Sequence, residues 1–73
     1  MRITRDYHAA KLYWGQMPLP EGGCIVGLVI LDNGERGALV KIADRYVQGN
    51  AGAIRTLPLE AKKKVERGDY EEV

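Results

Sequence analysis

The chain has 73 residues, of which 45% are hydrophobic and 29% are charged, and its formal net charge is +1. This length accommodates one domain spanning residues 1–73, and the apolar content is too high for a disordered chain. A net charge near zero creates no global field that would draw the protein to nucleic acid or to an anionic membrane. One cysteine and one histidine provide neither an internal disulfide nor the four ligands of a structural zinc site.

The N-terminal residues carry no apolar stretch of the kind that signal peptides contain. The longest apolar run, 24–31, is far shorter than the roughly 20 residues that a membrane-spanning helix needs. We therefore expect no membrane association. A single thiol without an export signal indicates a cytoplasmic protein.

Residues 3–14 fit two alternative structures. In the first, Thr4 caps a helix whose one face carries Ile3, Tyr7, Ala10 and Trp14. In the second, the aromatic residues near Trp14 form a strand over 11–16 that ends at Gly15. We favour the strand. Two prolines and two glycines then make residues 17–23 a loop.

A central hairpin is the clearest local prediction. Residues 24–31 are apolar and rich in β-branched side chains, which is typical of a strand covered on both faces. Asn33-Gly34 predicts a tight turn, because such turns need positive φ angles. In the return strand, 36–42, alternation places Ala38, Val40 and Ile42 on one face and Leu39 and Lys41 on the other.

The segment after the hairpin contains weaker signals. Residues 45–47 and 53–55 are expected to form short strands, joined by a turn over 48–52. Gly49 and Gly52 loosely resemble loops that cradle phosphates, with Asn50 between them as a candidate binding residue. The segment lacks the lysine and hydroxyl residue that end a P-loop. A plain turn is the favoured interpretation, and small-ligand binding at 48–53 is the alternative.

The C-terminal part predicts a helix over 58–67. Pro58 suits a first helical position, Gly68 is a natural stop, and the apolar stripe consists of Leu57, Ala61 and Val65. Residues 69–73 are expected to be a short tail. The whole pattern predicts an α+β domain with an antiparallel sheet of three to five strands, built around the 24–31/36–42 hairpin, or a partly open barrel.

The inventory of reactive side chains argues against an enzyme. The chain contains no serine, so a Ser-His-Asp arrangement is excluded, and the one conceivable Cys-His pair is Cys24 with His8. Cys24 begins the apolar strand, where a buried and inert thiol is expected, and His8 is expected to be a surface or partly packed residue. We expect no catalytic residue, no metal and no cofactor.

Two sets of residues are candidates for binding. Tyr13 and Trp14 point to opposite faces of the favoured strand, so one is expected in the core and the other exposed, where it would suit a binding hot spot. The second set forms a basic surface with an aromatic residue for stacking, as in small nucleic-acid-binding barrels, and comprises Lys41, Arg45, Tyr46 and Arg55.

These observations favour a small protein-interaction module, a regulator or inhibitor of the kind that phages and mobile elements encode. An RNA- or DNA-binding barrel is the alternative, with a small-ligand-binding protein as a third. We also predict a homodimer, or a monomer that buries apolar surface against its partner. The reason is that one helix covers one face of 24–31, which leaves the other face to a second subunit or to an N-terminal segment containing Tyr7, Leu12 and Trp14.

Overall fold

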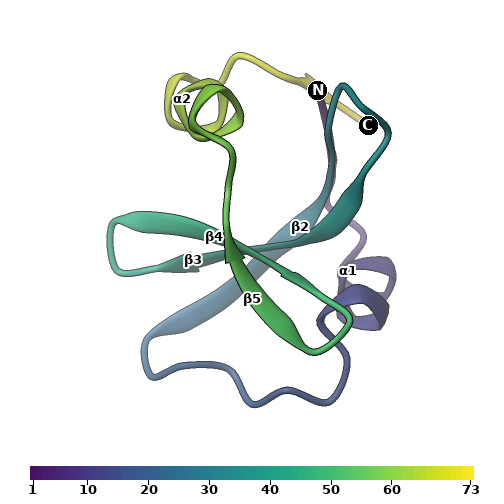
Figure 1. The fold of residues 1–73 in the computed structure, drawn as a ribbon, viewed down its shortest axis with the longest axis vertical. Coiled ribbons are helices and arrows are strands. Elements are labelled where there is room, and N and C mark those ends of the chain that lie inside the picture. The colour runs from purple at the N-terminus through teal and green to yellow at the C-terminus, as the bar shows by residue number, and fades with distance from the viewer.

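The computed structural model describes all 73 residues, which form two helices and one six-stranded sheet (Figure 1). In chain order the elements are β1 Arg2–Thr4, α1 Tyr7–Trp14, β2 Gly23–Ile30, β3 Arg36–Ile42, β4 Arg45–Asn50, β5 Ala53–Thr56, α2 Leu59–Arg67 and β6 Glu71–Glu72. The strand order is β5-β4-β3-β2-β1-β6, and only the β1–β6 pair is parallel. The predicted α+β class with a C-terminal helix is confirmed. The sheet has more strands than predicted and is not closed into a barrel, because β5 and β6 lie at open edges.

The N-terminal segment is a helix, so the favoured strand over 11–16 was wrong. Its N-cap is Asp6 rather than Thr4, and the Asp6 carboxylate accepts hydrogen bonds from the backbone N–H groups of His8 (3.0 Å) and Ala9 (3.1 Å). Gly15 ends the helix by donating to the carbonyl of Lys11 at 2.8 Å. The cap and two alanines favour the helix locally, whereas the aromatic residues that suggested a strand serve to pack it on the sheet.

The central hairpin is confirmed. Gly34 has φ +87° and its N–H donates to the carbonyl of Leu31 at 2.9 Å, while the Leu31 N–H donates to Glu35 at 2.8 Å. Only the glycine of the Asn33-Gly34 pair has a positive φ. A bulge between Ile25 and Gly27 interrupts the regular register of β2 with β3.

The turn after β4 is shorter than predicted. Residues Gln48 to Asn50 belong to β4, and only Ala51 and Gly52 form the turn, with φ of +53° and +80°. Two consecutive positive φ angles are what a two-residue type I′ hairpin turn requires. The short strands expected at 45–47 and 53–55 are present as parts of β4 and β5.

The C-terminal helix is confirmed, beginning one residue after Pro58, which is its N-cap. Gly68 ends α2 in the left-handed conformation, as expected. Residues 69–73 are not a free tail, because β6 pairs with β1. The N–H of Glu71 donates to the carbonyl of Met1, and the N–H of Val73 donates to the carbonyl of Ile3. A pattern of two exposed glutamates gives no strand signal, so this pairing was not predictable locally.

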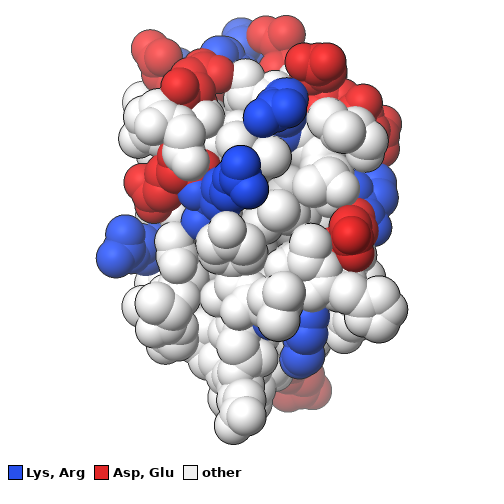
Figure 2. Space-filling view, turned by 90° about the vertical axis from the view of Figure 1, so that its right-hand side faces the viewer, with Lys and Arg blue, Asp and Glu red and all other residues white.

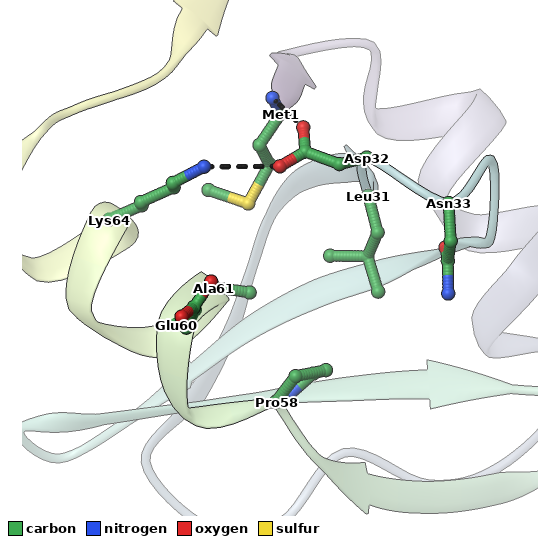
Figure 3. Close-up of a pocket in the computed structure, with 8 residues that line it drawn as sticks. All are labelled: Met1, Leu31, Asp32, Asn33, Pro58, Glu60, Ala61 and Lys64. Carbon is green, nitrogen blue, oxygen red and sulfur yellow. Dashed lines mark hydrogen bonds and ion pairs between the residues drawn. The ribbon is translucent and has the colours of Figure 1, made fainter.

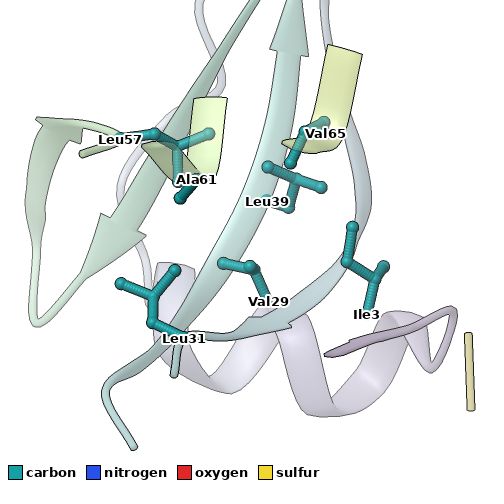
Figure 4. Close-up of a cluster of buried hydrophobic side chains, with 7 residues drawn as sticks. All are labelled: Ile3, Val29, Leu31, Leu39, Leu57, Ala61 and Val65. Carbon is teal, nitrogen blue, oxygen red and sulfur yellow. The ribbon is translucent and has the colours of Figure 1, made fainter. Parts of the chain in front are cut away.

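Two hydrophobic clusters occupy opposite faces of the sheet. The cluster on the α2 side comprises Ile3, Val29, Leu31, Leu39, Leu57, Ala61 and Val65 (Figure 4). The cluster on the α1 side comprises Ala10, Trp14, Ile25, Leu28, Ala38, Val40 and Val47. The alternation predicted for β3 is therefore confirmed. Each face of the central hairpin is covered within one chain, by α2 on one side and by Ala10 and Trp14 of α1 on the other.

Neither helix is long and apolar enough to cross a membrane.

Candidate interaction surfaces

The candidate basic residues do not all share a face of the sheet. Lys41 lies directly opposite Tyr46 in the β3–β4 register, and both lie on the α2 side with Leu39. Arg45 pairs with Ile42 instead and therefore lies on the α1 side. The expectation that Arg45 joins the others was wrong, because adjacent residues of a strand point to opposite faces.

Lys41 and Tyr46 form a cation–aromatic pair. The Lys41 ammonium lies 6.0 Å from the centroid of the Tyr46 ring, at the outer limit for such a contact. Tyr46 is half-buried at the margin of the α2-side cluster, and Lys41 is exposed. Cys24 lies directly opposite Lys41 on the neighbouring strand.

Cys24 is exposed, so the expectation of a buried thiol was wrong. It lies at the beginning of β2, on a part of the α2 side that carries the exposed Lys41 rather than core residues. His8 is exposed on α1, which covers the other side of the sheet. The two side chains therefore form no nucleophile–base pair in this structure. No three histidine, cysteine, aspartate or glutamate side chains gather in a way that would hold a metal ion.

Arg55 belongs to a polar group that sequence reasoning missed. Its guanidinium lies 3.7 Å from the Glu35 carboxylate, which also accepts a hydrogen bond from the Gln48 amide at 3.0 Å. Gln48 is 2% exposed and its carbonyl oxygen has no hydrogen-bond partner. The three residues meet because Gln48 and Arg55 are cross-strand neighbours and Glu35 precedes β3. No spacing in the sequence signals that arrangement.

The segment 48–53 contains no ligand cradle. The Asn50 side chain donates to the carbonyl of Arg36 at 2.9 Å and so ties the end of β4 to the start of β3. Gly49 lies under the Trp14 indole, where a Cβ would lie 2.0 Å from the ring atom Cε3. None of the three surface cavities is lined by residues 48–53. Packing against Trp14 explains Gly49, and the positive φ of the two-residue turn explains Gly52.

Tyr13 and Trp14 both face the sheet, because neighbouring helical residues are only about 100° apart. Trp14 has no exposed surface, and its indole N–H donates to the carbonyl of Met17 at 2.7 Å. Tyr13 is half-buried against the same cluster. Trp14 is therefore a core residue that a partner would not reach, and Tyr13 offers only part of its ring.

Exposed apolar side chains occur instead on α1, in the loop that follows it and on the α1 side of β5, a feature that sequence reasoning noticed only in part. Leu12 is 83% exposed on α1, and the other members of this apolar face are Tyr7, Leu19 and Ile54, which are 50%, 38% and 47% exposed. Residues 7–20 contain a single charged side chain, Lys11, and residues 46–54 contain none. Figure 2 shows the consequence: the lower half of this view, over α1 and the following loop, is almost free of charge.

The opposite end of the molecule is rich in charges and holds a small cavity of about 210 Å³ beside α2 (Figure 3). The Asp32 carboxylate there accepts hydrogen bonds from the Met1 amino group and, at 3.1 Å, from Lys64. These two cations hold the pKa of Asp32 below its ordinary value, with the amino group the larger cause. The cavity is smaller than typical ligand pockets, and its charged groups already neutralise one another.

No protein-family model, no curated protein and no solved structure matches this chain.

Proposed function

We propose that the protein is a small, non-catalytic protein-binding module that acts as a regulator or inhibitor by covering a surface of its partner. The observation that supports this proposal is that four of the six exposed large hydrophobic residues lie on α1, in the loop after it or on β5, in segments that carry few charges. The other two, Leu59 and Val73, lie at the start of α2 and at the C-terminus. In the view of Figure 2, most of the charged side chains lie in the upper part of the molecule, the end at which both termini lie in Figure 1.

An apolar face with few charges suits binding to another protein. Burial of apolar surface contributes about 25 cal/mol per Å², and a face that carries few charges has few ions to desolvate when a partner covers it. Leu12 is the most exposed large hydrophobic residue of the chain. Leu12 packs against neither hydrophobic cluster, so its side chain is available to a partner.

The experiment compares two matched variants, Leu12→Asp on the apolar face and Leu59→Asp on α2. Both leucines are largely exposed, at 83% and 65%, so neither change should unfold the domain. We expect Leu12→Asp to reduce capture of the partner from extracts of the source cell at least tenfold, whereas Leu59→Asp retains capture. Circular dichroism and thermal melting check that both variants are folded. Equal capture by the two variants would refute the proposal.

Nucleic-acid binding is the second candidate, and the Lys41–Tyr46 pair is the observation that favours it. An exposed cation beside an aromatic ring is the local arrangement of a single-strand stacking platform. Arg55 is on the same side of the sheet but lies near Glu35, and Arg45 lies on the other side.

A gel shift with single-stranded RNA separates this candidate from the first. If Lys41 and Arg55 contact two phosphates, log K falls against log salt with a slope of about 1.4, since each contact contributes about 0.7. Lys41→Ala should halve that slope. Binding that is absent at low salt, or that is unchanged in Lys41→Ala, would remove this candidate.

A further inference from the structure

We propose that the free edge of β5 receives an extended segment of the partner protein as an additional β-strand, with an acidic residue opposite Arg55. This inference rests on the proposed protein-binding function and specifies the chemistry of the partner. It concerns the backbone edge beside the apolar face, where Ile54 is the nearest member of that face.

The backbone of β5 offers unpaired hydrogen-bonding groups. β5 is the last strand of the sheet, with β4 as its sole neighbour, and all four of its residues are exposed. In a two-residue hairpin the residues flanking the turn form a hydrogen-bonded pair, and such pairs then alternate along the ladder. Ala53 and Arg55 therefore bond to β4, and the N–H and C=O groups of Ile54 and Thr56 point outward.

The two edges of the sheet differ in how they discourage strand pairing. β6, at one edge, is two glutamates long, and Glu72 is engaged by Arg5 at 2.7 Å. Short length and charge are common devices that protect an edge. β5 carries no proline, no lysine and no bulge, and all four of its residues are exposed. A row of free donors and acceptors of this kind matches the backbone of an extended chain.

The side chains of β5 indicate what that chain carries. Ile54 is 47% exposed on the α1 side and favours an apolar or β-branched neighbour. The Arg55 side chain is 61% exposed on the α2 side and has one acidic neighbour, Glu35, at 3.7 Å. That separation leaves most of the five guanidinium donors free, so a carboxylate on the incoming strand suits the position opposite Arg55.

A second copy of the chain fits this edge less well. An antiparallel two-fold pair centred on Arg55 would use the outward groups of both Ile54 and Thr56, but it places Arg55 against Arg55, and like charges directly opposite are destabilising. A pair centred on Ile54 avoids that clash but sets Thr56 against Gly52, which lies in the turn. A segment of another protein that carries a carboxylate can pair with the outward groups of both Ile54 and Thr56 and also place an opposite charge against Arg55.

The test uses the purified chain and a short blocked peptide in which threonine and valine alternate around a central glutamate. Isothermal titration measures affinity, and amide hydrogen exchange followed by NMR locates the contact. We expect binding that slows exchange of the Ile54 and Thr56 amides, and at least tenfold weaker binding of the same peptide with a central lysine. Equal binding of the two peptides, or unchanged exchange at both amides, would overturn the proposal.

Two variants sharpen the result. Arg55→Glu should reverse the preference, so that the lysine peptide binds better than the glutamate peptide. N-methylation of the Thr56 amide, introduced by ligating synthetic segments at Gly23–Cys24, removes one outward donor and should weaken binding at least tenfold while the fold is retained. An Arg55→Glu chain that keeps the original preference would contradict the proposed pairing.

Two other outcomes overturn the strand proposal without removing the protein-binding function. Protection of the Ile54 and Thr56 amides that rises with protein concentration, in the absence of peptide, would assign the edge to a second copy. Loss of partner capture in Leu12→Asp, together with peptides that do not bind β5, would leave docking on the apolar face as the whole interaction.

Discussion

The contact between Trp14 and Gly49 is the most specific residue-level feature of this fold. Trp14 is the largest fully buried side chain, and its ring lies directly on the backbone of β4. Glycine is a poor strand former, so its presence within β4 needs a packing reason. The ring supplies that reason, because any side chain at position 49 would occupy the same space.

Gly49→Ala should therefore destabilise the protein by about 1–3 kcal/mol, the usual cost of overpacking a core. The measurement is the midpoint of urea denaturation. In a Trp14→Leu background the ring is absent, and the additional cost of Gly49→Ala should fall well below its value in the natural chain. Equal costs in both backgrounds would show that the contact does not determine residue 49.

At the scale of elements, the short helix α1 depends on the sheet for its stability, and the β2–β3 hairpin forms the centre of that sheet. An isolated helix of eight residues is marginal in water, so α1 owes its stability to the packing of Ala10 and Trp14. The β2–β3 hairpin is the element that both helices cover. Its turn therefore determines the register of the strand pair on which both hydrophobic clusters are built.

Replacement of Gly34 tests that turn. Gly34 has φ +87°, and no atom outside its neighbours lies near the position of a Cβ, so the cost of a side chain there comes from the backbone alone. Gly34→Val should lower the free energy of unfolding by about 1 kcal/mol or more, because β-branched residues resist positive φ. Gly34→Asn, which tolerates this conformation better, should cost less. An unchanged denaturation midpoint for valine would contradict the turn.

At the scale of the whole molecule, the single chain is already compact. Its accessible surface is 4601 Å², and a folded monomer of 8.1 kDa is expected to expose about 4,500 Å². Because α1 and α2 cover both faces of the hairpin, the core does not require a second subunit. The homodimer stays a prediction, and light scattering across a dilution series measures it directly.

The ion pairs that join the chain's beginning to α2 predict a pH dependence of stability. The pKa of Asp32 is lowered in the folded state, so its contribution is present at pH values above its ordinary pKa of about 3.9 and is lost as the pH falls through the lower folded value. Asp32→Asn should lower the melting temperature slightly at pH 7, and this difference from the natural chain should shrink as the pH falls through the acidic range. Added salt should reduce the effect, because the carboxylate is 66% exposed.

Asp44→Asn is the matched control, since Asp44 makes no ion pair and its replacement should produce no such pH-dependent difference. A difference between the natural chain and Asp32→Asn that does not shrink on acidification would show that the effect does not arise from the carboxylate charge.

The sequence alone determined the elements whose signals are local. Apolar alternation and Gly34 identified the hairpin, and the spacing of Leu57, Ala61 and Val65 with Gly68 identified α2. Such signals lie within about ten residues of one another, so they are readable without knowledge of the fold. For the candidate surfaces, residue type grouped Lys41, Arg45, Tyr46 and Arg55, and the alternation of β4, which was not applied there, places Arg45 on the opposite face from Tyr46.

Tertiary structure decided the rest, because the deciding contacts join distant residues. Trp14 meets Gly49 across the sheet, and Arg5 meets Glu72 from 67 residues away, so neither the helix α1 nor the strand β6 has a complete local signature. Register brought Glu35, Gln48 and Arg55 together. The exposure of Leu12 depends on which face of α1 packs against the sheet, and the exposure of Cys24 depends on which part of the sheet the helices cover. The packing of the two helices decides both, and the local sequence pattern does not.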